Sequence, residues 1–315
     1  MSGFLLDFFT FGAAFLAGLL IYPVLIAALR RYRSSQVIQA ELPVAHHKKV
    51  GTPTGGGIAF VALGILGGLL AALAGHPGAL PAVAGLAAGG LLGMADDRAK
   101  LRVGSIGIPA RLKFPLQFLL AVPAVWLAEG TGEQVGIPIG LGWLYWPVAL
   151  VAVVGAANAV NLTDGLDGLA GATGLVALAG LVLLLPGALA GEKAAALATC
   201  GGLAAFLVFN RHPARVFMGD TGSLGVGYAL GAMALQQHLV LLLPLLGLVF
   251  VLETLSVIIQ VAYFKATGGR RVFKMTPIHY TFQLEGWSEN RIVLAFGATA
   301  VLAALLSAGL VRVLA

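Results

Sequence analysis

The chain has 315 residues, of which 59% are hydrophobic and only 10% charged, with 44 glycines and one cysteine. Soluble domains carry about 25% charged residues, so this composition excludes a soluble fold, and its hydrophobicity excludes intrinsic disorder. The single cysteine excludes a disulfide framework and a cysteine-based zinc site. A net charge of +6 would suggest a nucleic-acid partner for a soluble protein. In a membrane protein the same excess indicates orientation, and no nucleic-acid partner is expected.

Apolar stretches of the length that crosses about 30 Å of hydrocarbon recur along the whole chain. They predict one all-α domain over residues 1–315, a polytopic integral membrane protein of about ten transmembrane helices. Several stretches are interrupted by glycine or proline, which neighbouring helices make tolerable in a membrane. The expected helices cover residues 4–29, 55–75, 79–95, 112–128, 143–160, 168–187, 194–210, 221–237, 239–264 and 292–313.

Lysine and arginine are divided very unevenly between the two sides of the membrane that these helices define. Alternate loops hold all but two of the 19, and only Lys193 and Arg312 fall on the other side. The positive-inside rule places the basic loops in the cytoplasm and both termini outside. Asp7 precedes the apolar part of 4–29 and arginines follow it, which is the reverse of a secretory signal peptide. We therefore expect this stretch to remain a transmembrane helix.

Most polar side chains gather at the predicted cytoplasmic face, where we expect an active site. Taken singly, each polar segment has another explanation as a helix cap, a flexible helix entry or an orientation signal. Together they combine carboxylates, lysines and glycine-rich backbone, which favours metal-assisted handling of a phosphorylated substrate. The segments are 30–54, 96–113, 158–168, 210–223 and 265–291.

Two of these segments are unusually acidic. Adjacent carboxylates at Asp96 and Asp97 repel one another near hydrocarbon, and a divalent cation or a lysine such as Lys100 would relieve that repulsion. The segment 158–168 holds two acids and two amides where a cytoplasmic loop usually carries basic residues. Helix capping explains only one or two of these side chains. We therefore expect the segment to bind hydroxyls, a base edge or a metal.

Other segments have features typical of phosphate binding. Asp220 begins a predicted helix beside glycines, and a helix N-terminus binds anions while a carboxylate there can hold Mg²⁺ against a phosphate. Lys49 precedes the glycine-rich stretch 51–57, which indicates a phosphate cradle, although it lacks the Gly-Lys-Ser/Thr of a Walker A loop. His279, in the basic segment 265–291, can hydrogen-bond a phosphate.

Several of these stretches resemble the motifs of a known family, the polyprenyl-phosphate N-acetylhexosamine-1-phosphate transferases. The resemblance rests on Asp96-Asp97, on Asn-Leu-Thr-Asp-Gly-Leu-Asp-Gly-Leu-Ala at 161–170 and on Phe-Met-Gly-Asp-Thr-Gly-Ser at 217–223. The MraY branch, the phospho-N-acetylmuramoyl-pentapeptide-transferases, is similar in three further motifs. These are Lys-Val-Gly-Thr-Pro-Thr at 49–54, Glu-Thr-Leu-Ser-Val-Ile-Ile-Gln at 253–260 and Pro-Ile-His at 277–279.

The resemblance implies transfer of phospho-MurNAc-pentapeptide from UDP-MurNAc-pentapeptide to undecaprenyl phosphate, which forms lipid I and UMP in peptidoglycan synthesis. It also implies Mg²⁺ as cofactor, the bacterial cytoplasmic (inner) membrane as location with the active site facing the cytoplasm, and a homodimer. Both substrates are polyanions, so the protein must supply cations and positioning more than covalent chemistry. A two-step route through an aspartyl–phosphoryl intermediate stays open.

The resemblance further implies roles for residues at matching positions. Asp220 and Asp164 are the expected Mg²⁺ ligands. Asp97, next to Asp96, is the candidate base or orients the lipid phosphate, and His279 is expected at the pyrophosphate. The expected substrate-binding residues are Lys49, Thr54, Lys100, Asn161, Asp164, Asp167, Asn210, Phe217 and Gln260.

One departure from the MraY branch keeps a second activity open. The branch usually has three consecutive histidines, but His279 is followed by Tyr280 and Thr281, so transfer of GlcNAc-1-phosphate from UDP-GlcNAc is the alternative. A membrane transporter, from a different class, would need ionisable residues near the bilayer centre and repeat symmetry. Only Glu253 is a charged residue near the middle of a predicted span, and a structural polar contact is its favoured interpretation.

Overall fold

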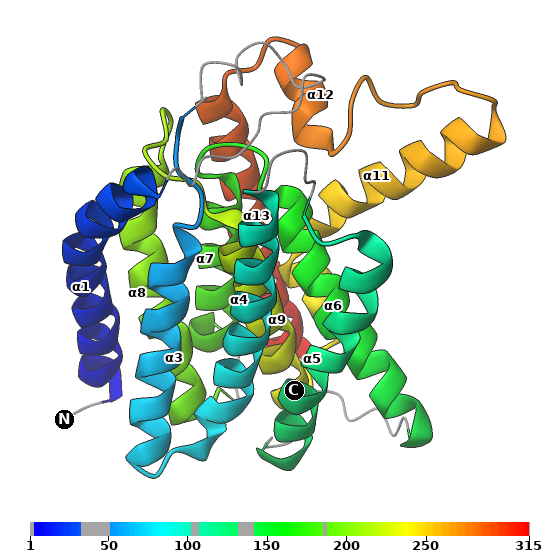
Figure 1. Cartoon of the computed structure of the whole chain (residues 1–315). Coiled ribbons are helices and arrows are strands. Elements are labelled where there is room, and N and C mark those ends of the chain that lie inside the picture. Colours follow the sequence, from blue (N-terminus) through cyan, green and yellow to red (C-terminus); the bar gives the residue numbers. More distant parts are fainter. Residues whose placement is uncertain (1–2, 33–50, 102–106, 132–141, 185–187, 315) are drawn as a thin grey trace.

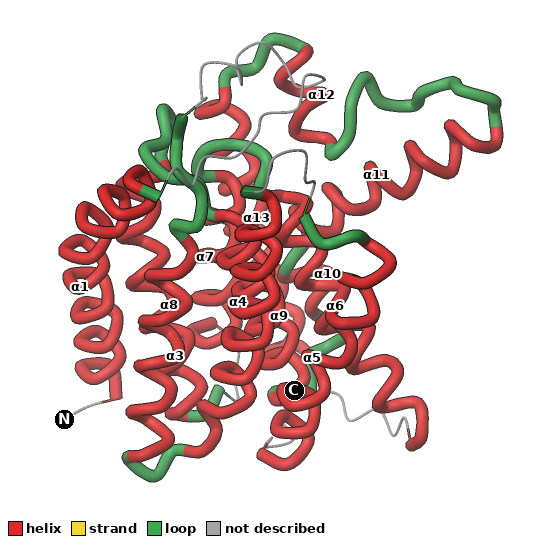
Figure 2. The backbone as a smooth tube through the Cα atoms, viewed as in Figure 1, coloured by secondary structure: helices red, strands yellow, loops and turns green. Residues whose placement is uncertain are grey.

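The computed structural model describes residues 3–32, 51–101, 107–131, 142–184 and 188–314. Over these ranges the chain is a bundle of helices with no β-sheet, so the all-α prediction is confirmed there (Figure 1, Figure 2). The helices are α1 (Gly3–Arg31), α3 (Gly57–Leu73), α4 (Leu80–Lys100), α5 (Ala110–Thr131), α6 (Tyr145–Thr163), α7 (Leu169–Ala179), α8 (Ala190–Asn210), α9 (Gly219–Gln236), α10 (Leu243–Leu246), α11 (Leu248–Ala266), α12 (Ile278–Leu284) and α13 (Glu289–Leu314).

Helices occupy every apolar stretch that the sequence indicates, although not all of them are typical spans. In the described part of the chain, seven helical segments are long and apolar enough to cross a membrane. The helix α3, and α7 with its continuation Gly180–Leu184, are shorter, and α9 is not among the seven. The expected span 239–264 is divided at Gly247 between α10 and α11. Ten spans and outward-facing termini therefore stay predictions.

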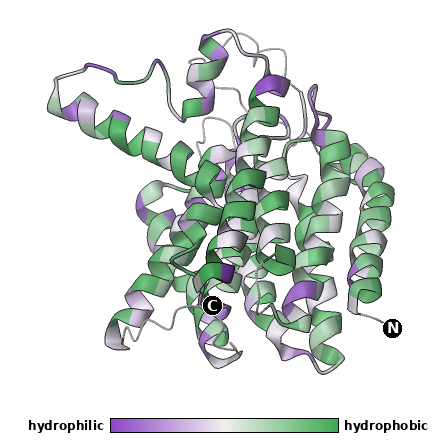
Figure 3. Cartoon of the chain, turned by 180° about the vertical axis from the view of Figure 1, so that it is seen from behind, coloured by the Kyte–Doolittle hydropathy of each residue, from purple (hydrophilic) through white to green (hydrophobic). Residues whose placement is uncertain are grey.

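The exterior of the bundle is apolar along its sides. Figure 3 shows hydrophobic residues over much of the helix surface, with hydrophilic residues gathered at the end that carries α12 and the neighbouring loops. Large exposed side chains include Phe4, Leu20, Leu73 and Leu294. Lipid tails offer nothing for a polar side chain to bond, so an apolar exterior with polar ends is the arrangement that a bilayer requires.

The helix α9 lies at the centre of the bundle. Every residue from Asp220 to Gln236 is buried, and α3, α4, α5 and α6 all pack against this helix. Polar residues open and close it, with Asp220 at one end and Gln236 at the other. Its first turn is therefore positioned by the helices that are packed around it.

The structure moves the boundaries of two predicted polar segments. The helix α6 continues past Asn158 and Asn161, so these amides lie on a helix, and the connection to α7 is only 164–168. Asp96 and Asp97 likewise belong to the helix α4 and not to the loop after it. The carboxylates and amides are thus held on helix ends, which fixes them more firmly than a loop does.

Candidate active site

Glycines bring the end of α4 against the start of α9. Gly89 and Gly93 are four residues apart on α4, and both pack directly on the backbone of α9. A methyl group added at Gly93 would lie 2.2 Å from the carbonyl oxygen of Asp220, far inside van der Waals contact. Small residues at this spacing let membrane helices approach closely. The contact places Asp96 and Asp97, about one turn further along α4, beside Asp220.

Two lysines and two aspartates form the charged centre of the site. The Nζ atom of Lys100 lies 2.8 Å from Asp96 Oδ2 and 2.7 Å from Asp220 Oδ1. Lys113, in the first turn of α5, lies 3.2 Å from the same Asp96 oxygen and donates a short hydrogen bond to Asp220 Oδ2. Lys113 is a site residue that the sequence analysis missed. A lysine at the edge of a span is equally explained as an orientation signal, so the sequence held no separate signal for it.

Asp97 faces the backbone of α9 instead of the lysines. One of its oxygens accepts the N–H of Asp220 at 2.9 Å, and the other accepts the N–H and hydroxyl of Thr221 at 3.0 and 2.7 Å. Free N–H groups and the positive end of the helix dipole both favour a carboxylate at a helix start. Asp96, by contrast, contacts the lysines and accepts the N–H of Ile108 at 2.7 Å. The two neighbouring aspartates therefore have different environments.

Residues from α6 and from the segment before α9 complete this side of the site. Asn161 donates from its side chain to Asp220 at 3.2 Å and to Ser223 at 2.9 Å. Thr54 and Phe217 form an isolated parallel β-bridge, in which the N–H of Phe217 donates to the carbonyl oxygen of Pro53 at 2.8 Å. The glycine-rich entry to α3 is thereby joined to the start of α9.

The short loop 164–168 carries the remaining predicted carboxylates. Burial, reinforced by the charges of Asp220 and Asp97, raises the pKa of Asp164 to about 7. Asp167 is buried, and its Oδ2 lies 2.8 Å from His212 Nδ1 and accepts the N–H of Ala214 at 3.1 Å. The loop is therefore tied to the segment between α8 and α9.

Two further side chains hold this loop by its backbone. Asn210, at the end of α8, accepts the N–H of Gly168 at 2.8 Å, and Glu289, at the start of α13, accepts the N–H of Asp167 at 3.2 Å. Asp167, His212 and Glu289 each offer a ligand atom within 4.8 Å of the others. Asp167 and Glu289 already accept backbone N–H groups, so we interpret these three residues as a structural contact that holds loop 164–168 in place and not as a metal site.

His279 and Gln260 lie on the far side of loop 164–168, on α12 and α11. The ring of His279 is fully buried, with Nδ1 3.1 Å from Glu253 Oε1, and it faces Gly165 rather than an open surface. Gln260 accepts the N–H groups of Val272 and Phe273 at 3.0 and 2.9 Å. Gln260 also lines a cavity of about 510 Å³ together with Lys265, Arg271 and Lys274. Lys49 lies outside the described residues, so the structure does not place it.

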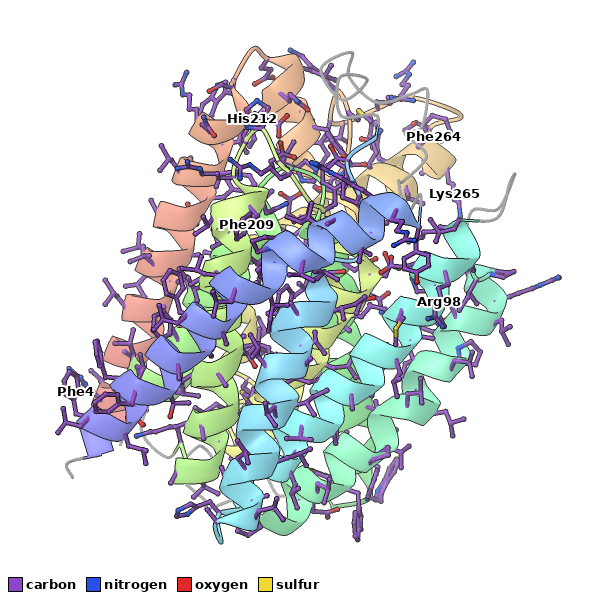
Figure 4. All side chains as sticks on the ribbon, turned by 60° about the vertical axis from the view of Figure 1, so that its left-hand side comes forward. Phe4, Arg98, Phe209, His212, Phe264 and Lys265 are labelled. Carbon is purple, nitrogen blue, oxygen red and sulfur yellow. The ribbon has the colours of Figure 1, made fainter. Side chains whose placement is uncertain are left out.

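These groups gather at one end of the molecule. Figure 4 shows His212 and Lys265 toward that end and Phe4 nearer the opposite end of the bundle. With lysines, carboxylates and amides on helix ends next to an apolar bundle, the site suits an anionic substrate that meets a membrane-borne one.

Comparison with known proteins identifies the family. The model of glycosyl transferase family 4 matches residues 79–238, a range that contains Asp96, Asp97, Asp164 and Asp220. This chain belongs to glycosyl transferase family 4. The matched range includes both α4 and α9, the two helices whose close contact brings the charged centre together.

Curated relatives align over nearly their whole length, and each is named phospho-N-acetylmuramoyl-pentapeptide-transferase. The relative from Moorella thermoacetica is 42% identical over 91% of this chain and 93% of its own length. That from Desulforamulus reducens is 45% identical over 90% of each chain, and that from Listeria monocytogenes is 38% identical over 95% and 96%. The predicted membership of this branch is confirmed, and its apolar helices make the chain a membrane-embedded bacterial member of the family.

Proposed function

We propose that this chain transfers phospho-MurNAc-pentapeptide from UDP-MurNAc-pentapeptide to undecaprenyl phosphate. An oxygen of the lipid phosphate attacks the phosphorus that bears the sugar, the bond from that phosphorus to the UMP oxygen breaks, and lipid I and UMP are formed. The names of the relatives support the transferred group, phospho-N-acetylmuramoyl-pentapeptide, and the resemblance of the motifs implies the nucleotide donor and the lipid acceptor. The observation that carries the proposal is the pair of lysines between Asp96 and Asp220 at one end of an apolar bundle.

The two lysines answer the main physical difficulty of this reaction. Both substrates are anionic, so bringing them together costs electrostatic energy that fixed cations offset. Asp96 and Asp220 hold both Lys100 and Lys113 in place, and each ammonium group keeps a third N–H that can donate to a phosphate oxygen. Asn161 adds a neutral hydrogen bond that helps to hold Asp220 in place.

The carboxylates suit Mg²⁺, and we assign the ion to Asp220 together with Asp164. Mg²⁺ prefers oxygen ligands and is usually held by one or two carboxylates plus substrate phosphates. Asp164 is half-buried beside two further carboxylates, and desolvation, with the charges of Asp220 and Asp97 added to it, raises the pKa of Asp164 to about 7. A divalent cation would offset these negative charges, so the residues fit the ion. When bound, Mg²⁺ would neutralise charge on the pyrophosphate.

Asp97 is better suited to positioning than to proton abstraction. Three hydrogen bonds from α9 already occupy its oxygens. The second pKa of a phosphate monoester is about 6, so the lipid phosphate is mostly ionised at neutral pH and needs no strong base. We propose that Asp97 holds the start of α9, and with it Asp220, in place.

The site is proposed to face the cytoplasm of a bacterial inner membrane. Among the described residues, Lys100 and Lys113 lie in the site and Lys265 lies at the same end of the bundle, and the positive-inside rule puts such basic residues in the cytoplasm. The homodimer stays a prediction from the resemblance.

A single assay tests the reaction and its substrate. Purified protein in detergent, given undecaprenyl phosphate and Mg²⁺, is expected to release UMP from UDP-MurNAc-pentapeptide and not from UDP-GlcNAc. Asp220→Asn should abolish release, whereas Asp7→Asn, a matched change on α1 at the other end of the bundle, should leave it intact. Release from UDP-GlcNAc alone would establish the alternative that Tyr280 and Thr281 keep open.

A further inference from the structure

The sequence shows a carboxylate inside a predicted span, and the structure shows what that carboxylate meets. Glu253 lies in the second turn of α11 and is fully buried. A buried charge in a membrane is expensive unless it is paired. Its Oε1 lies 3.1 Å from Nδ1 of His279, which is also fully buried, and its Oε2 accepts the N–H of His279 at 3.5 Å. The two side chains form a pair that joins the membrane helix α11 to the first turn of α12.

The other face of the imidazole supports the loop that carries Asp164 and Asp167. A methyl group added at Gly165 would lie 2.2 Å from His279 Nε2 and 2.9 Å from the hydroxyl of Tyr280. The rings of His279 and Tyr280 are in contact, with centroids 4.1 Å apart. The backbone at Gly165 therefore rests directly on these two rings, and no side chain intervenes.

The histidine is held by charge and packing more than by aligned hydrogen bonds. Neither ring nitrogen of His279 has a well-aligned hydrogen-bond partner among the described residues, although Nδ1 lies close to Glu253. Buried polar atoms are nearly always bonded, so an exception calls for a reason. Here the carboxylate on one side and the loop backbone on the other keep the ring in one place.

We propose that Glu253 is a positioning residue that acts through His279. It holds the imidazole against Gly165 and so fixes loop 164–168, which carries Asp167 and the proposed Mg²⁺ ligand Asp164. The inference rests on the proposed function for its effect on turnover, but the placement of the loop is a property of the folded chain.

The test combines hydrogen exchange of the loop with a double-mutant cycle. Glu253→Leu removes the carboxylate with little change in volume, and His279→Ala removes the ring. Each change is expected to speed exchange of the amides at 164–168 and to lower UMP release by about 10- to 100-fold, as loss of a residue that orients a functional group does. The double variant should be no worse than the worse single variant, because the two residues act as one unit.

Control variants separate positioning from general damage. Thr254→Val changes the residue next to Glu253 on α11. Among the described residues, the Thr254 hydroxyl donates only to the carbonyl of Phe250 in the same helix, so its loss should change neither hydrogen exchange nor UMP release. Glu253→Gln keeps an oxygen facing the ring and should restore most activity. If Glu253→Leu does not fold, Gly165→Ala tests the same contact, since its methyl group displaces the ring.

Two results would overturn the inference. One is unchanged exchange at 164–168 in folded Glu253→Leu or Gly165→Ala protein. The other is a double variant whose loss equals the product of the two single losses. If the wild type releases no UMP, the proposed function fails, but the exchange measurement still decides whether Glu253 positions the loop.

Discussion

At the scale of single residues, neighbours in the sequence have separate tasks. Asp96 and Asp97 are adjacent, yet one contacts Lys100 and Lys113 while the other accepts hydrogen bonds from the start of α9. A helix turns by about 100° per residue, so adjacent side chains point in different directions. Asp96 therefore pairs with the lysines of the site, whereas Asp97 holds the first turn of α9.

Lys113 is expected to be as important for activity as Lys100, which the sequence already indicated as a site residue. Lys113→Ala leaves Asp96 and Asp220 with one cation fewer and removes a donor from the site, so kcat for UMP release should fall by about 100-fold or more. Lys193→Ala, which removes a lysine at the other end of the bundle, is the matched control. Activity of Lys113→Ala within twofold of the wild type would remove Lys113 from the site.

Asp164 predicts a dependence of stability on pH. Its pKa is raised from 3.8 to about 7 in the folded chain, so the folded state holds this proton more tightly than the unfolded state does. The free energy of unfolding contributed by Asp164 is therefore greatest at low pH and is lost as pH rises toward about 7. Thermal unfolding in detergent with a chelator, from acid to neutral pH, should show the wild type losing stability relative to Asp164→Asn. Parallel curves would contradict the shift.

At the scale of elements, close contact between helices builds the site. The glycines of α4 let its backbone touch that of α9, and this contact sets the distance between Asp96 and Asp220. Gly93→Ala should separate the two helices, cost about 1–3 kcal/mol as overpacking does, and greatly reduce turnover. Gly130→Ala, where a methyl group meets no atom within 4 Å, is the matched control and should be neutral or slightly stabilising.

A thermal unfolding series and the UMP assay on the same preparations check this prediction. If Gly93→Ala keeps both the stability and the activity of Gly130→Ala, the direct contact of α4 with α9 is not needed.

Most of the helices could be predicted from the sequence, but the contacts between them could not. Hydropathy locates a helix because the bilayer sets its length. It places the end of α6 too early, because Asn158 bonds Gln117 and Asn161 bonds Ser223, so these polar residues point at other helices and not at water. The motifs indicated the site carboxylates, whereas the partner of Glu253 lies 26 residues away and becomes visible only in the fold.

At the scale of the whole molecule, the bundle has one polar working end and apolar sides. The lone cysteine, Cys200, is buried, so single introduced cysteines can report which end faces which side of the membrane. Gly3→Cys should react with a membrane-impermeant maleimide added outside cells, and Lys265→Cys should react only after the membrane is opened. Labelling of Lys265→Cys from outside would reverse the predicted orientation.

The wholly buried α9 has a consequence for how the chain is made. It contacts almost no lipid, carries Asp220 and Gln236 at its ends, and is not among the segments apolar enough to span by themselves. A translocon that sorts segments by hydrophobicity would hold such a helix poorly. The helices that pack against it in the described part of the chain, α3, α4, α5, α6 and α7, all precede it in the sequence. The helices that α9 packs against have therefore already been synthesised when α9 leaves the ribosome. Packing against them can keep α9 in the membrane, where the other spans are retained by their own hydrophobicity.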